Sequence, residues 1–198
     1  MIRKQQQEKK RKAVSLYRFL PALVAGAMLW GACESPQGLR SLEGERFAMD
    51  SLSGHAATVV FFLSPECPMC INYSLTINRL YNEFQNRDIV FYGVFPGTFY
   101  KESEIRAYLN EYEPEVIPLL DPDYAFTHTL GARVTPEAFV FDAGGTLAYR
   151  GAIDNWVPKL GQKRTVITQH YLADALHALA AGQAPPLRQT KAVGCLIE

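Results

Sequence analysis

Two cysteines separated by two residues, Cys67 and Cys70, are the residues whose type and spacing point most directly to chemistry. They follow the run 58–63 (TVVFFL), whose β-branched and aromatic residues predict a strand buried on both faces. Apolar residues then recur at roughly helical spacing at Ile71, Leu75, Leu80 and Phe84. We therefore expect Cys67 at the junction of a buried strand and a helix.

This position favours a reactive thiol at Cys67. Free N–H groups and the helix dipole at a helix start stabilise an anion, so the pKa of a cysteine there falls. Cys70 lies one turn further along and is expected to be less exposed. The asymmetry predicts that Cys67 attacks a disulfide and that Cys70 resolves the resulting mixed disulfide. Pro68 suits the first helical position, where no N–H is needed.

Other uses of the cysteine pair stay open. A zinc site needs about four ligands, and none of the four histidines (His55, His128, His170, His177) is near another cysteine in sequence. Copper held by two thiolates and one histidine is possible, although Sco-type chaperones space their cysteines CxxxC. A purely structural disulfide would close a very small ring. Thiol–disulfide exchange, which needs no cofactor, is the leading interpretation.

The remaining pattern alternates strands and helices. Strands are predicted at 89–95 and 116–120, helices at 102–112 and 164–181, and a Gly-rich hairpin at 138–150. Asp121 is expected to cap a short helix that has Pro122 at its first position and ends near Gly131. The order predicts a layered α/β domain with a partly parallel sheet closed by an antiparallel hairpin.

The cysteine pair after its strand, followed by residues 134–142 (VTPEAFVFD), resembles the thioredoxin superfamily. It is similar to the redoxin branch, the AhpC/TSA and TlpA/ResA-like proteins, over about residues 42–182, including the extra strand within 114–121. The resemblance implies a three-layer α/β/α sandwich with a mixed central sheet. It also implies that Pro136 is a cis-proline beside the cysteines and that the Thr135 backbone pairs with an extended substrate peptide. A trans proline at the start of an edge strand is the alternative.

The chain departs from these families at the residue before the first cysteine, where Glu66 replaces the usual Trp. A carboxylate beside a thiolate opposes its ionisation. Glu66 is thus a candidate proton shuttle or a solvated turn residue. The Pro-x-x-x-Thr-x-x-Cys loop of peroxiredoxins is not matched, and Arg150 is either a peroxidase-like arginine or a strand cap in solvent. Thiol peroxidase is the alternative enzyme.

Cys195 has no counterpart in minimal thioredoxins and lies in a tail, residues 184–198. Three interpretations stay open: a third redox thiol at the active site, an intermolecular bridge, or a buried small apolar residue. His128, on the helix before Pro136, either approaches Cys67 or is exposed. A copper carrier would use Cys67 and Cys70 with His128 or Cys195.

The first 32 residues have the pattern of an export signal. Residues 1–19 hold seven Lys/Arg against one acid, Glu8, and residues 20–32 are uncharged and apolar. A membrane span needs about 20 apolar residues, so this run is short for one. Gly31-Ala32-Cys33 resembles a bacterial lipobox, with Trp30 in place of the usual aliphatic residue. An ordinary cleaved signal and an uncleaved anchor are the alternatives.

The predicted organisation is a signal at 1–32, a tether at 33–40, a thioredoxin-like domain at 41–183 and the tail. Residues 33–198 carry 13 Lys/Arg and 19 Asp/Glu, which argues against nucleic-acid binding. We expect an exported thiol–disulfide oxidoreductase of the periplasm or cell envelope, anchored to the membrane through a lipid on Cys33, with protein thiols or disulfides as partners.

Overall fold

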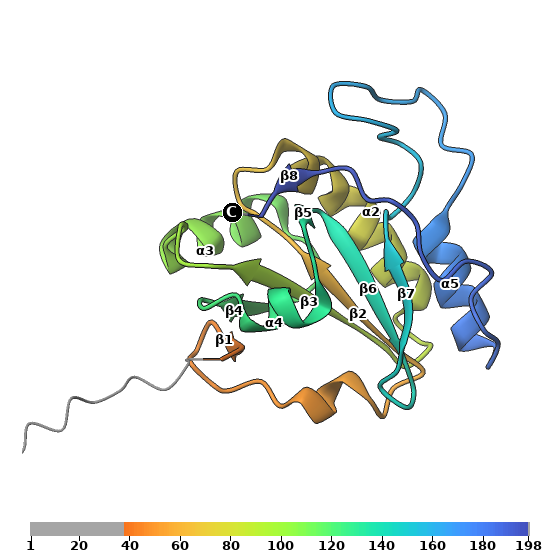
Figure 1. The fold of residues 1–198 in the computed structure, drawn as a ribbon, viewed down its shortest axis with the longest axis horizontal. Coiled ribbons are helices and arrows are strands. Elements are labelled where there is room, and N and C mark those ends of the chain that lie inside the picture. The colour runs from red at the N-terminus through yellow and green to blue at the C-terminus, as the bar shows by residue number, and fades with distance from the viewer. Residues whose placement is uncertain (1–37, 198) are drawn as a thin grey trace, which may run out of the picture. The chain divides into compact units, whose positions relative to one another are not determined.

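The computed structural model describes residues 38–197, which form a six-stranded mixed sheet with helices on both faces (Figure 1). The strand order is β1-β4-β3-β2-β6-β7. Strands β2, β3 and β4 run parallel, and β6, β7 and β1 pair antiparallel to β2, β6 and β4 respectively. The bounds are β1 Arg40–Ser41, β2 Ala57–Phe62, β3 Ile89–Pro96, β4 Ile117–Asp121, β6 Glu137–Asp142 and β7 Leu147–Gly151. The predicted thioredoxin-like α/β fold with a mixed central sheet is confirmed.

Strand β2 shows how the two faces are covered, because all six of its residues are buried. Alternate side chains of a strand point to opposite faces. Val59 and Phe61 belong to the core formed with α2 (Pro68–Phe84), α3 (Glu102–Tyr112) and α5 (Tyr171–Ala180). Val60 and Phe62 belong to a second core, with α4 (Ala125–Leu130) and the 3-10 helix η1 (Met49–Leu52). The central strand is thereby fixed on both sides, and the loop that follows it starts from a rigid base.

The buried face of α2 differs in part from the predicted one. Leu75 was expected on the apolar side, but it is 66% exposed, whereas Ile77 is fully buried. Cys70, Ile77 and Phe84 are seven residues apart, about two helical turns, and together define the stripe that packs on the sheet. Because Cys70 belongs to this stripe, burial of the helix fixes the position of the second cysteine.

Two predicted helix starts are wrong. The short helix begins at Ala125 rather than after Asp121, which ends β4, although the Asp121 carboxylate accepts hydrogen bonds from the N–H groups of Phe126 and Thr127. The last helix begins at Tyr171 rather than Arg164. Residues 165–168 include a β-branched run, and the Asn155 side chain accepts the N–H groups of Thr168 and Gln169. Asp121 thus bonds the first turn of α4 from four residues before its start. Asn155 holds Thr168 and Gln169 in the loop before α5.

The C-terminal segment returns along the open edge of the sheet. Arg150 of β7 donates its N–H to the carbonyl of Arg188 at 3.0 Å, and Thr190 donates to the carbonyl of Arg150 at 3.0 Å. Gly151 allows this approach, because it has a φ of +135° and a Cβ there would overlap the Thr190 carbonyl. The segment ends in β8 (Cys195–Leu196), which pairs antiparallel with β5 (Val134–Thr135) (Figure 1).

None of the helices within residues 38–197 is long and apolar enough to cross a membrane. The expected export signal, the lipobox with Cys33 and most of the tether lie outside the described residues.

Candidate active site

Cys67 lies at the junction of β2 and α2, as predicted. It has an extended backbone conformation at the N-cap of α2, and Pro68 occupies the first turn. Its N–H bonds to the Ser64 carbonyl, and its own carbonyl accepts the first helical hydrogen bond from Ile71 at 3.1 Å. The strand and helix that flank Cys67 are both anchored in the core, so the thiol is held in a defined place.

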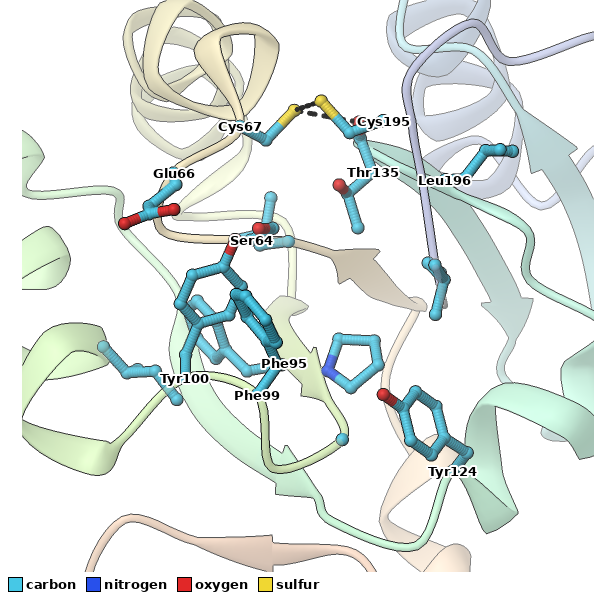
Figure 2. A pocket seen from close by; sticks show the side chains of 15 residues that line it. Ser64, Glu66, Cys67, Phe95, Phe99, Tyr100, Tyr124, Thr135, Cys195 and Leu196 are labelled. Carbon is cyan, nitrogen blue, oxygen red and sulfur yellow. Dashed lines mark hydrogen bonds between the residues drawn. The ribbon is translucent and has the colours of Figure 1, made fainter.

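The Cys67 sulfur is surrounded by groups from three parts of the chain. Cys195 Sγ lies 2.7 Å away and the Thr135 carbonyl oxygen 3.2 Å away. Figure 2 shows the two sulfurs facing each other between the start of α2 and the C-terminal strand. Cys67 is only 2% exposed, and Cys70 is fully buried, with its Sγ accepting the Ser64 N–H at 3.4 Å. All three cysteines are free thiols.

These surroundings make Cys67 the acidic thiol of the site. The side chain of Cys70 donates to the Cys67 thiolate and is the largest cause lowering its pKa, to about 5. Burial opposes this, while Cys195, the backbone N–H of Cys70 and Thr135 act in the same direction as Cys70. Burial raises the pKa of Cys70 well above its usual value, and that of Cys195 to about 12. The thiolate is therefore on Cys67, with two protonated thiols beside it.

Thr135 and Pro136 close the site from the opposite side. Their peptide bond is cis, as the family resemblance implies. The Thr135 hydroxyl is buried, and none of the described residues forms a hydrogen bond with it. Thr135 nevertheless lowers the pKa of both Cys67 and Cys70, because it stabilises their thiolate forms. The Thr135 backbone, expected to pair with a substrate peptide, pairs here with Cys195.

An apolar groove of about 340 Å³ opens beside Cys67. We call this the active-site groove; its lining includes Phe95, Phe99, Tyr100, Tyr124 and Leu196 (Figure 2). Phe99 is 81% exposed and Leu196 is 73% exposed, so the rim carries large apolar side chains in contact with solvent. Such a surface suits a partner that also covers apolar area.

The aromatic residues of the active-site groove differ in their exposure. Phe95 is 2% exposed, and the exposed ring is that of Phe99, further along the loop. Trp156 packs edge-on against Tyr73 at 5.3 Å and joins the loop after β7 to α2. No sequence signal distinguished Phe99, because one aromatic residue in a loop has no periodicity.

Three further candidate residues were placed as follows. Glu66 is exposed on the groove rim, and its carboxylate points away from the Cys67 sulfur (Figure 2). His128 is exposed and stacks on Tyr124, with no contact to the cysteines among the described residues. Arg150 is not a strand cap in solvent: its guanidinium donates to the carbonyls of Leu130 and Gly131. Arg150 also pairs with the buried Glu137 at 3.5 Å.

A buried polar pair that the sequence did not indicate supports the site from below. The Tyr73 hydroxyl, one turn after Cys70, donates to Asp154 Oδ1 at 2.7 Å, and the Trp156 N–H donates to the same oxygen at 2.9 Å. Asp154 is 4% exposed. This pair ties α2 to the loop after β7.

Within residues 38–197 no group of three or more His, Cys, Asp or Glu side chains is arranged to hold a metal ion. The candidate copper ligands His128 and Cys67 are not brought together.

Comparisons with known proteins agree with this fold. The sequence model of the AhpC/TSA family matches residues 35–150. A search of curated proteins found no relative by sequence. An uncharacterized conserved protein from Geobacillus kaustophilus superposes with a TM-score of 0.71 at 24% identity, covering 83% of this chain and 88% of that one. A hypothetical protein from Sinorhizobium meliloti 1021 gives 0.70 at 21% identity, covering 80% and 88%.

A secreted disulfide oxidoreductase of Mycobacterium tuberculosis, homologous to DsbE of E. coli, superposes with a TM-score of 0.50 at 18% identity. The match covers 72% of this chain and 92% of that one. At these identities the likeness establishes the fold and leaves the activity to be argued from the site.

Proposed function

The chain belongs to the AhpC/TSA family, within the thioredoxin superfamily, and from this premise we propose that it is a thiol–disulfide oxidoreductase that exchanges two electrons with a partner protein. The observation that carries the proposal is the Cys67 thiol, which has a pKa lowered to about 5 and lies at the start of α2 next to the protonated Cys70. A stabilised thiolate beside a second thiol is the arrangement that disulfide exchange requires.

In the first step the Cys67 thiolate attacks one sulfur of a partner disulfide. A bond forms between that sulfur and Cys67 Sγ, the partner's S–S bond breaks, and its second sulfur leaves as a thiolate that takes a proton from solvent. The partner segment lies against Thr135, whose carbonyl oxygen is 3.2 Å from Cys67 Sγ.

In the second step Cys70 resolves the mixed disulfide. The Cys67 charge that raises the pKa of Cys70 is gone once Cys67 is bonded, so Cys70 loses its proton more readily. Cys70 Sγ then attacks Cys67 Sγ, the Cys67–Cys70 disulfide forms, and the partner's first sulfur leaves as a thiolate. The partner gains two electrons and this protein loses two; the reverse sequence oxidises a partner dithiol.

Reduction of insulin in the presence of dithiothreitol tests the activity. The unsubstituted protein is expected to accelerate insulin precipitation, and Cys67→Ser to remove the acceleration. Cys33→Ser is the matched control, since it changes a cysteine far from the pair in sequence, and it should retain the activity. Equal rates for Cys67→Ser and the unsubstituted protein would contradict the proposal, and rapid peroxide consumption without insulin reduction would favour a peroxidase.

We also propose that the protein is exported and that Cys33 carries a lipid that anchors it to the membrane. The basic and apolar segments before Cys33 support this, and the M. tuberculosis structural neighbour is a secreted protein. Labelled palmitate should be incorporated in cells and lost in Cys33→Ala, while Cys195→Ala should keep the label. Full release of the unsubstituted protein into the soluble periplasm would oppose the anchor.

A further inference from the structure

The C-terminal strand occupies the place expected for a partner's peptide. Cys195 pairs antiparallel with Thr135, and Leu196 pairs with Val134, so the tail adds a strand at the cis-proline. Addition of an extended segment to an exposed strand is a recurrent mode of peptide recognition. Here the segment that binds belongs to the same chain.

The strand brings a cysteine to the reacting atom. Cys195 Sγ is 2.7 Å from Cys67 Sγ, closer than the Thr135 carbonyl oxygen at 3.2 Å. In thiol–disulfide exchange the sulfur of one cysteine attacks a sulfur of another, so the two atoms must lie next to each other. Cys195 is half-buried and Leu196 beside it is exposed, so the strand lies at the surface of the site.

The fold holds this strand by contacts on both sides of Cys195. Before it, the Thr190 hydroxyl bonds to the Tyr149 hydroxyl at 2.6 Å and accepts the Ala152 N–H at 3.0 Å. After it, the Ile197 N–H donates to the Arg133 carbonyl at 3.0 Å. The tail is therefore docked at two places, on β7 and the residue after it, and on the residue before β5.

Gly194 permits the close approach. A Cβ at this position would overlap the Thr135 carbonyl oxygen and lie 2.8 Å from the carbonyl carbon and 3.0 Å from Val134 Cβ. Any larger residue would push the strand away from Thr135. A glycine directly before the cysteine is what a strand needs to place that cysteine against Cys67.

We propose that residues 193–197 act as a tethered substrate: they fill the partner's binding position and present Cys195 as a third redox cysteine that exchanges with Cys67. This rests on the proposed function and adds to it a cysteine that forms an alternative disulfide. A partner protein reaches Cys67 when this strand leaves Thr135.

The internal exchange is balanced within the chain. Starting from the Cys67–Cys70 disulfide, Cys195 Sγ gives up its proton and attacks Cys67 Sγ. The Cys67–Cys195 bond forms, the Cys67–Cys70 bond breaks, and its electron pair leaves on Cys70 Sγ, which takes up a proton. The exchange moves the disulfide from the fully buried Cys70 to a residue at the surface without net oxidation.

Disulfide mapping of the full-length Cys70→Ser variant tests the proposal. The reduced variant is treated with oxidised glutathione, which supplies the two-electron oxidation, and free thiols are blocked before trypsin digestion. Cleavage after Arg46 and Arg79 releases residues 47–79, with Cys67, and cleavage after Lys191 releases residues 192–198, with Cys195. A Cys67–Cys195 disulfide therefore joins two peptides that mass spectrometry identifies as one species.

We expect most of Cys67 to be recovered in the linked species. Recovery of Cys67 as its glutathione adduct with Cys195 free would overturn the tethered substrate while leaving the proposed function intact, because Cys67 would still have exchanged. Recovery of Cys67 as a free thiol would overturn both.

A second variant tests the binding of the strand itself. Gly194→Ala, added to Cys70→Ser, is expected to lower the rate of linkage about tenfold, because the added methyl group is overpacked against Thr135. Gly144→Ala is the matched control, since a Cβ there meets nothing closer than 3.4 Å. Gly194→Ala should also speed alkylation of Cys67 by opening the site. Equal linkage rates in the two alanine variants would overturn the docked strand.

Discussion

The sulfur atoms of Cys67 and Cys195 lie 2.7 Å apart although 128 positions separate them in the chain. Three distant segments meet at this point: the β2–α2 junction, the cis-proline strand β5 and the C-terminal strand β8. The site thus contains one acidic thiol and two protonated ones.

The first prediction concerns the ionisation of Cys67. Only the thiolate reacts with iodoacetamide, so alkylation of Cys67 should rise with pH and reach half its maximum near pH 5, the value to which its pKa is lowered. Cys70→Ala removes the largest cause of this lowering and should move the midpoint upward, whereas Cys70→Ser keeps a donor and should move it less. A midpoint near the usual cysteine value in the unsubstituted protein would contradict the assignment.

The second prediction compares two apolar residues of α2. Ile77 is fully buried, so Ile77→Ala should lower the free energy of unfolding by about 2–5 kcal/mol. Leu75 is 66% exposed, so Leu75→Ala should change it by no more than about 0.5 kcal/mol. Urea denaturation of both variants measures the difference. A larger loss for Leu75→Ala would mean that α2 buries its other face.

The third prediction concerns the hydrogen bond between Tyr73 and Asp154. Tyr73→Phe leaves a buried carboxylate oxygen without this donor and should cost about 2 kcal/mol of unfolding free energy. Tyr81→Phe is the control on the same helix, because within residues 38–197 its hydroxyl has no hydrogen bond and its ring contact with Phe91 would be kept. Similar denaturation midpoints for the two variants would contradict a supporting role for the pair.

The fourth prediction concerns the pairing of Arg150 with Glu137. Arg150→Met removes the partner of a carboxylate that is 6% exposed, together with two bonds to the end of α4. It should lower the free energy of unfolding by about 2–3 kcal/mol. Arg79→Met, at an exposed position of α2, should have little effect. If Arg150→Met instead abolished insulin reduction without loss of stability, Arg150 would belong to the reaction and not to the fold.

The parts of the site that sequence predicts well are those with local signals. The apolar run before Cys67, the proline after it and the helical recurrence of apolar residues place this cysteine at the start of α2, and the structure confirms this. The VTPEAFVFD stretch adds Pro136 through family resemblance, and its peptide bond is cis.

What sequence does not predict depends on contacts between distant segments. Strand β8 has two residues, too few to show a sequence pattern. It reaches β5 only because the preceding part of the tail runs beside β7, where Gln189 pairs with Arg150. Leu75 fits helical spacing from Ile71 but lies off the stripe that Cys70 and Ile77 set by burial. Arg150 shows no local sign of its partner Glu137, which lies on the neighbouring strand β6.

Trapping of a mixed disulfide tests the central claim most directly. The full-length double variant Cys70→Ser, Cys195→Ser lacks both thiols that lie beside Cys67, so an intermediate formed with insulin should persist. Intact-mass analysis is expected to show a covalent adduct, and digestion should place it on residues 47–79 through Cys67. Recovery of the double variant unmodified, with its Cys67 thiol still free, would contradict the exchange mechanism.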